Sequence, residues 1–196
     1  MKTIIVILGA AALIFFIAQA FIMRSTLKTE GHKYSVLKDF GSFEIRKYEP
    51  ALFSYVVVQA DSYKSVSSKG FSKLAGYIFG GNEKDQKIAM TTPVAMSMDD
   101  SVTMKFKIPE DMTLDEMPKP TNSEVRFLSE PEKIVAAIRF GGWPSDESIE
   151  KNTRKLLQLL AENNIDHNGN ISYLGYNPPF ELINRRNEII VEVTYP

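Results

Sequence analysis

The sequence predicts an α+β protein: a tandem duplicated βαββ unit that forms a distorted, mostly antiparallel β-barrel flanked by two main helices, plus an N-terminal transmembrane helix. Three observations support this fold class. The chain opens with a long apolar run that carries no charge. Behind it, segments with strand-type alternation surround two segments that each have one apolar stripe at helical spacing. The order of these segments occurs twice, which indicates an internal duplication.

The N-terminal apolar run predicts a membrane segment. Residues 4–23 carry no charge and are long enough for a helix to cross the hydrocarbon core, and Gln19 is their only clearly polar side chain. Ala18-Gln19-Ala20 also has the small-x-small form of a cleavage site, so a cleaved signal peptide is the alternative. Because the apolar run continues to Met23, we favour an anchor. We therefore assign residues 1–24 to a transmembrane anchor or signal segment, and residues 25–33 to a polar tether.

The charges around this segment leave the side of the membrane open. Lys2 stands alone before the apolar run, whereas several basic residues follow it, which favours a cytoplasmic body. The very short leading tail is typical of an exported protein. Of the two, we favour a single-pass membrane protein with an extracytoplasmic body.

Residues 34–109 form the first predicted repeat. Its strands are recognised by alternating polarity or by β-branched and aromatic side chains, and its helix by one apolar stripe. The expected elements are strands at 43–48 and 51–58, a helix whose stripe is Phe71, Leu74, Ala75 and Ile78, and strands at 87–90 and 102–108. Gly80-Gly81-Asn82 ends the helix with residues that tolerate positive φ.

Residues 123–196 repeat this order after a proline-containing connector at 110–122. Glu130-Pro131 precedes an apolar strand just as Glu49-Pro50 does, 81 positions earlier. The expected elements are strands within 125–140, a helix with its stripe at Ile149, Thr153, Leu156, Leu157 and Leu160 and a cap at Ser145 or Asp146, and strands at 171–176 and 189–193. Each one-striped helix needs a sheet face to cover, and we expect a ligand cleft between sheet and helices.

Composition excludes several classes of function. The chain has 196 residues, 44% of them hydrophobic and 24% charged, as in an ordinary folded domain with an appendage. Its net charge of −1 gives no electrostatic reason to expect a nucleic-acid partner. Because the chain has no cysteine and only two histidines, disulfides and thiolate catalysis are excluded, and we expect no metal site built from protein side chains.

The search for catalytic motifs is negative. The chain contains no nucleophile elbow, phosphate-binding loop, zinc-protease motif or dinucleotide fingerprint. His32 in the tether and His167 in a turn are interpreted as solvent histidines. Arg185 and Arg186 are candidates to bind carboxylates, or else solvated turn residues. We therefore expect no enzyme and no catalytic residue.

Several stretches carry a family resemblance. They are Ser42-Phe43-Glu44-Ile45-Arg46-x-Tyr48-x-Pro50, Gly70-Phe71-x-Lys73-Leu74-x-x-Tyr77-Ile78, Gly81-Asn82-Glu83-Lys84, Lys87-Ile88-x-Met90-Thr91-x-Pro93-Val94, Gly175-Tyr176-Asn177-Pro178-Pro179 and Asn184-Arg185-Arg186-Asn187-Glu188. In this order they resemble the SOUL haem-binding protein family over about residues 34–194. The resemblance implies that residues 34–196 form a SOUL-like domain, a duplicated βαββ barrel with two helices, in agreement with the repeat.

The resemblance also implies non-covalent binding of haem or a related tetrapyrrole. Some members carry a histidine, proposed to hold iron, at the position that Lys47 occupies here. Another branch binds the porphyrin in an apolar groove along the first helix. The corresponding ligand-binding candidates are Phe71, Leu74, Ala75 and Ile78, with Met90 behind them and Arg185 and Arg186 as propionate partners. The axial ligand is left open.

The first hypothesis is thus a membrane-tethered protein that binds haem or a related tetrapyrrole without catalysis. The alternative is an effector or sensor module for another small amphipathic ligand. A hydrolase ranks last, because the sequence shows no convincing acid–base pair.

Overall fold

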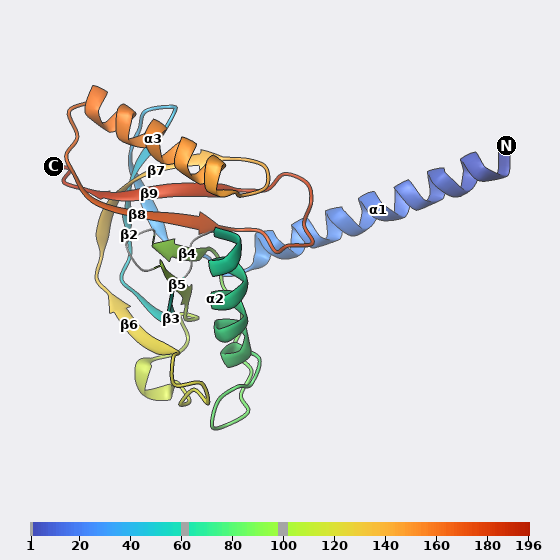
Figure 1. The fold of residues 1–196 in the computed structure, drawn as a ribbon, viewed down its shortest axis with the longest axis horizontal. Helices are drawn as coiled ribbons and strands as arrows, with labels where there is room; N and C mark the ends of the chain where they lie inside the picture. Colours follow the sequence, from blue (N-terminus) through green and yellow to red (C-terminus); the bar gives the residue numbers. More distant parts are fainter. Residues whose placement is uncertain (1, 60–62, 98–101) are drawn as a thin grey trace.

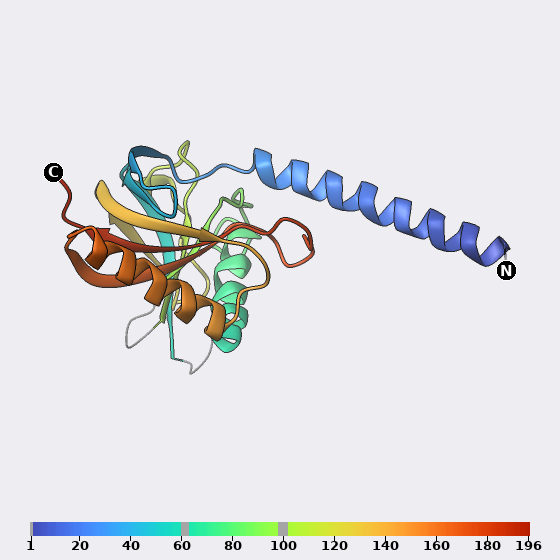
Figure 2. The same ribbon diagram turned by 90° about the horizontal axis from the view of Figure 1, so that it is seen from above.

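The structure is a computed structural model that describes residues 2–59, 63–97 and 102–196. Its elements in chain order are α1 (Lys2–Lys28), β1 (Tyr34–Asp39), β2 (Glu44–Tyr48), β3 (Ala51–Val58), α2 (Tyr63–Ile78), β4 (Val94–Ser97), β5 (Val102–Lys107), a short 3-10 helix η1 (Leu114–Glu116), β6 (Arg126–Glu130), β7 (Lys133–Phe140), α3 (Asp146–Glu162), β8 (His167–Gly175) and β9 (Asn187–Val193). α1 projects as a long rod from a body that contains the strands and the other two long helices (Figures 1 and 2).

The described strands form one antiparallel sheet in the order β1-β2-β7-β9-β8-β4-β5-β3-β6. The two halves of the chain interleave in it, since β2 pairs with β7, β3 with β6 and β4 with β8. The sheet is open: no pairing among the described strands joins β1 to β6, and β1 is exposed at five of its six positions, as an edge strand is. The α+β class is confirmed, and the closed barrel is not.

Each half of the chain runs strand–strand–helix–strand–strand, as β2-β3-α2-β4-β5 and as β6-β7-α3-β8-β9. The order matches the expected repeat, while the duplication itself stays a prediction. α3 begins as the sequence predicts, because the Ser145 hydroxyl accepts a hydrogen bond from the backbone N–H of Ser148 at 3.2 Å.

The strand expected at residues 87–90 is wrong. The segment makes one isolated bridge, from Phe79 to Lys87, and the next strand after α2 is β4. The side chain of Asn82 shapes the loop before this segment, because it donates to the carbonyl of Gln86 at 2.7 Å and accepts from two backbone N–H groups of the same loop. The segment then bonds to the end of α2 and not to a strand, since Ile88 donates its backbone N–H to the carbonyl of Ile78 at 2.8 Å.

The sheet buries apolar side chains on both faces. Ala136 and Ile138 belong to the main core, which α2 and α3 cover, whereas the alternate residues Val135 and Ala137 belong to a second cluster on the other face. α2 lies over β3 and β5, and α3 lies over β7 and β9 (Figure 1). The second cluster consists of Tyr48, Ala95, Val135, Ala137, Leu174 and Ile190. Both helices therefore share one face, which leaves the other face free to form a site.

The connection from α1 to the body differs from the expected tether. α1 continues through Lys28, so residues 25–28 are helical. The following residues are held against the body: His32 donates its backbone N–H to the carbonyl of Thr92 at 3.0 Å, and Thr92 donates to the carbonyl of Glu30 at 2.8 Å. Glu30 also pairs with the buried Lys107. α1 itself is long and apolar enough to cross a membrane, which is compatible with an anchor or a signal sequence.

Candidate functional site

The helix face predicted to hold the ligand lies in the main core. Leu74 and Ile78 are almost completely buried there and Ala75 is also buried, while Phe71 is partly buried with its ring edge-on to Phe106 at 5.4 Å. Met90 is 36% exposed and is not part of this core. Because the sheet already covers this face, a ligand groove at these residues stays a prediction.

Arg185, a predicted carboxylate partner, is occupied by the loop that carries it. Its guanidinium donates to the carbonyls of Asn177, Pro178 and Glu181 at 2.6–3.2 Å, and it lies over the ring of Trp143 at 4.3 Å. These hydrogen bonds hold the loop in shape. Binding of Arg185 to a propionate stays a prediction.

The other two predicted cations also have protein partners. Arg186 pairs with Glu188 at 2.7 Å, and Lys47 pairs with Glu132 at 2.9 Å on an exposed part of the surface. Lys47, at the position of the family's histidine, therefore lies outside the hollow described next.

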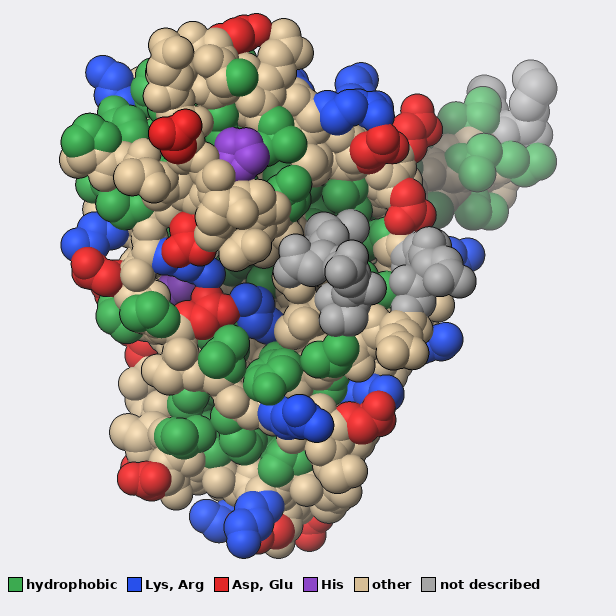
Figure 3. Space-filling view, turned by 60° about the vertical axis from the view of Figure 1, so that its left-hand side comes forward, with side chains coloured by type: hydrophobic (Ala, Val, Ile, Leu, Met, Phe, Trp, Pro, Cys, Tyr) green, Lys and Arg blue, Asp and Glu red, His purple; other side chains and the backbone are tan. Residues whose placement is uncertain are grey.

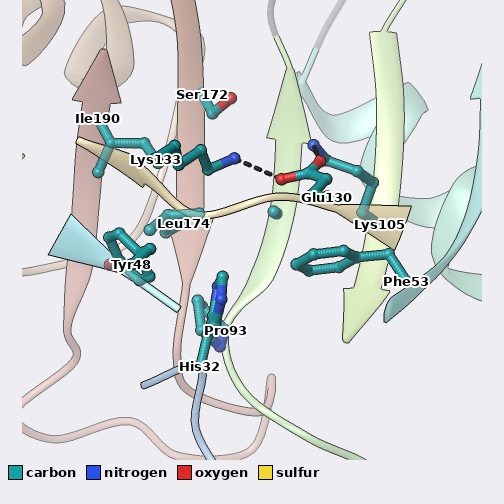
Figure 4. Close-up of a pocket in the computed structure, with 11 residues that line it drawn as sticks. His32, Tyr48, Phe53, Pro93, Lys105, Glu130, Lys133, Ser172, Leu174 and Ile190 are labelled. Atoms are coloured by element: carbon teal, nitrogen blue, oxygen red, sulfur yellow. Dashed lines mark hydrogen bonds and ion pairs between the residues drawn. The ribbon is translucent and has the colours of Figure 1, made fainter. Parts of the chain in front are cut away.

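A hollow lies on the sheet face opposite the helices, where the two halves of the sheet meet. Its closed part has a volume of about 30 Å³, and the empty space rises to about 410 Å³ when the open solvent at its mouth is included. Its lining residues are His32, Tyr48, Phe53, Pro93, Ala95, Lys105, Glu130, Lys133, Ser172, Leu174 and Ile190 (Figure 4). We expected the cleft between the sheet and the helices, where side chains of the main core pack together, and a ligand cleft there stays a prediction. The hollow described here lies on the other face.

The charged side chains of the hollow form a triad centred on Glu130. Lys105 and Lys133 each approach its carboxylate to 2.5 Å, and Figure 4 shows the Lys133 contact. Burial would raise the pKa of Glu130, but the charges of Lys133 and Lys105 outweigh burial and hold its pKa below the usual range. The carboxylate is therefore ionised at neutral pH. Two ammonium groups and one carboxylate leave one net positive charge, which suits a ligand with an acidic group.

His32 lies in the wall of this hollow, although its polar neighbourhood in the sequence indicated a solvent histidine. Its ring contacts Tyr48 at 4.7 Å and Phe53 at 5.5 Å between centroids. Nε2 is 2.7 Å from the carbonyl of Glu49, and a carbonyl only accepts, so Nε2 carries the proton and Nδ1 keeps its lone pair. Burial lowers the pKa of His32, which makes the neutral form dominant at pH 7.

A buried ion network on the same face holds β2 to β9. Arg46 donates two hydrogen bonds to Glu188, at 2.7 and 3.2 Å, and Arg186 and the Tyr176 hydroxyl donate to the same carboxylate. Arg46 also lies over the ring of Tyr34 at 4.4 Å. Burial would raise the pKa of Glu188, but the two arginines hold it below the usual range. These pairings fix the strands that form one wall of the hollow.

A metal site and a nucleic-acid surface each have an expected pattern of side chains. Within the described residues, no group of three or more His, Asp or Glu side chains is placed to hold a metal ion. On the face shown in Figure 3, basic and acidic side chains are interspersed among apolar ones without a continuous basic stripe.

Comparison with known proteins identifies the family of the chain. Residues 29–192 match the family described as SOUL heme-binding protein. The chain belongs to this family. It is 33% identical to heme-binding protein 2 of Mus musculus and of Homo sapiens over 158 residues, which is 76% of this chain and 77% of each relative. It is 26% identical to heme-binding protein 1 of Xenopus laevis over 160 residues, 78% of this chain and 84% of that protein.

Solved structures share the fold at much lower sequence identity. The C-terminal domain of EcmrR superposes with a TM-score of 0.61 at 11% identity, covering 83% of this chain and 99% of that domain. A hydrolase from Listeria innocua superposes with a TM-score of 0.57 at 9% identity, covering 88% of this chain and 97% of that one. At these identities the similarity extends to the fold and not to the activity.

Proposed function

We propose that this chain binds haem or a related tetrapyrrole non-covalently and without catalysis, while α1 tethers it to a membrane. The observation that carries the proposal is the hollow, which combines apolar and aromatic walls, a neutral histidine and two lysines. A tetrapyrrole has a flat apolar ring, acidic side groups and a metal-binding centre, and each has a counterpart among these residues. Membership of the SOUL family supports the same ligand.

The residues of the hollow fit one edge of a tetrapyrrole ring. His32 is neutral and keeps the Nδ1 lone pair, as an iron ligand must, and the one net positive charge of Lys105, Lys133 and Glu130 is suited to one carboxylate. The closed space of the hollow is about 30 Å³, far below the roughly 300–1,000 Å³ of ligand pockets, so side chains at its mouth must move apart to admit the edge of a large ring. Bound haem supplies a redox-active iron. The chain's own part is to exclude water from the ring edge and to neutralise its acidic groups.

The small size of the hollow favours a second candidate, an effector or sensor module for a smaller amphipathic anion. Such a ligand would place its acid beside Lys105 and Lys133 and its apolar part against Phe53 and Leu174. A hydrolase remains last in order, because Glu130 is held ionised between two lysines, which is typical of a structural ion pair.

Titration of hemin into the full chain in detergent micelles tests the proposal, with empty micelles as the blank. We expect a saturable one-to-one shift of the Soret band. In the hollow, Lys133→Gln removes a charged hydrogen bond to an acidic group, which corresponds to about tenfold weaker binding. Lys119→Gln, at an exposed lysine, is the matched control.

Three outcomes separate the readings. Weaker binding in Lys133→Gln and His32→Phe with no effect of Phe71→Asp supports the hollow. Weaker binding in Phe71→Asp, with no effect of Lys133→Gln or His32→Phe, supports the groove beside α2. A titration without saturation refutes tetrapyrrole binding, and a thermal-shift screen of amphipathic acids then tests the second candidate.

The tether has its own test. α1 has an apolar run of membrane-spanning length, and almost all of it lies outside the folded body (Figure 2). We infer an uncleaved anchor with an extracytoplasmic body. Protease added to intact cells that carry the protein should digest the body and leave a short membrane-bound fragment. Protection of the body from protease would place it in the cytoplasm.

A further inference from the structure

The β8–β9 loop, residues 177–186, is fixed to the apolar helix α1. The side chain of Gln19 donates from Nε2 to the carbonyl of Phe180 at 3.1 Å and accepts at Oε1 from the backbone N–H of Leu182 at 2.8 Å. Gln19 is only 7% exposed, while its helical neighbours on both sides are exposed. Seven residues further on, the Thr26 hydroxyl donates to the carboxylate of Glu181 at 2.6 Å. The loop and the end of α1 lie side by side in both views (Figures 1 and 2).

The position of Gln19 sets the level of this contact. The uncharged run of α1 ends at Met23, four residues after Gln19, and Arg24 follows. Four residues correspond to roughly 6 Å along a helix. Interfacial elements are buried about 5–10 Å into the boundary between headgroups and acyl chains. If α1 spans a bilayer, the loop is therefore held at the depth of that boundary.

The loop carries side chains that suit this depth. Phe180, Leu182 and Ile183 are large apolar residues with exposed fractions between 41% and 60%. Trp143, which lies under the guanidinium of Arg185 at the base of the loop, is 57% exposed. Exposed apolar clusters are unfavourable in water and mark contact surfaces, and tryptophan and arginine are typical of membrane interfaces.

Part of the backbone of the loop is hydrogen-bonded within the protein. Gln19 pairs with one carbonyl and one N–H, Glu181 donates its N–H to Pro178 at 3.1 Å, and Arg185 donates to three further carbonyls. These bonds lower the cost of bringing the loop into contact with lipid, where unpaired peptide groups are unfavourable.

We propose that the β8–β9 loop, together with Trp143, inserts into the lipid interface beside α1 and gives the body a second membrane contact. The inference rests on the proposed function in one respect, namely that α1 spans the membrane. The occupant of the apolar surface is the bilayer, because the same loop is hydrogen-bonded to the segment that enters it. The body is then held in one orientation over the membrane.

Depth-dependent quenching tests the inference on the full chain in phosphatidylcholine vesicles with bromine either near the headgroup or near the chain end. Trp143 is the chain's single tryptophan, so the native protein reports directly. We expect the shallow bromines to quench Trp143 more strongly than the deep ones. Phe180→Trp with Trp143→Phe should be quenched at least as strongly. The matched control is Leu128→Trp with Trp143→Phe, an exposed site on β6, away from α1 (Figure 1), which should not be quenched.

A carbonate wash of the same vesicles separates the two proposals. Loss of the full chain from the washed vesicles overturns both the tether and the inserted loop. If the chain is retained but neither native Trp143 nor the Phe180→Trp reporter is quenched, insertion of the loop is overturned and the tether stands. This outcome includes the case in which another protein or a second copy covers the loop. Retention with shallow quenching that Phe180→Ser and Ile183→Ser together reduce supports the loop.

Discussion

Replacing Arg46 by methionine should destabilise the body far more than the same change at its neighbour. Arg46 and Glu188 are both almost fully buried and share two hydrogen bonds, so Arg46→Met leaves a buried carboxylate with one cation removed. Breaking a buried ion pair from one side costs about 3–5 kcal/mol. Because Arg186 and Tyr176 still donate to Glu188, we expect the low end, about 3 kcal/mol. With urea m-values of about 1–3 kcal/mol/M, this lowers the unfolding midpoint by about 1–3 M.

Urea unfolding of the full chain in micelles, followed by far-UV circular dichroism, measures this loss. Lys47→Met is the matched control, since Lys47 is the next residue of β2 and its pair with Glu132 is exposed. Exposed pairs contribute about 0–1 kcal/mol. Equal midpoints for the two variants would refute the reasoning. Adding Glu188→Gln to Arg46→Met should cost less than the two single losses added together, because each single variant already loses the Arg46–Glu188 ion pair and the double variant loses it only once.

Three further predictions follow from the same contacts. Gly81→Ala should destabilise the body by about 1–3 kcal/mol, because the added Cβ would lie 2.7 Å from the backbone oxygen of Gly76. Gly76→Ala places its Cβ in open space on α2 and should stabilise the body by about 0.5–1 kcal/mol. Urea unfolding midpoints measure both effects. Stability should fall as the pH drops below about 4.3, because Glu130 and Glu188 have lowered pKa values in the folded body, so at these two residues the unfolded chain takes up protons first. Glu130→Gln should reduce this fall in urea midpoints measured between pH 7 and 3. Gln19→Leu keeps the apolar helix but leaves two backbone groups of the β8–β9 loop unpaired, so limited proteolysis in micelles should cut that loop faster than in the native chain.

Local patterns made the helices and many of the strands predictable. Ser145 and the apolar stripe that includes Leu156 fix the start and the buried face of α3 within one stretch of sequence. The partners of each strand are not encoded locally. The pairing of β2 with β7 and of β3 with β6 depends on the whole sheet, so the sequence indicated a barrel where the structure has open edges.

The site was harder to predict because both sheet faces are buried. Lys105 alternates with Met104 and Phe106, a pattern that normally indicates a solvent-facing lysine. Here the alternate face is a second interior, and Lys105 meets Glu130 from a different part of the chain. The role of His32 was not predicted for a similar reason. Its polar neighbours in the sequence indicated a solvent-exposed tether, whereas its ring contacts come from β2 and β3. Gln19, the polar residue in an apolar run, was visible in the sequence, but its loop partner was not.

The short segment between α1 and β1 determines where a soluble fragment of this protein can begin. Residues 30–32 supply His32 to the hollow and bind the Thr92 backbone next to Pro93, another lining residue. A fragment cut immediately before β1 would keep the strands but lose part of the wall, and would also leave the buried Lys107 without Glu30. Weak ligand binding by such a fragment would then reflect its missing residues. The folded body thus begins at about residue 30, inside the segment that the sequence assigned to a polar tether.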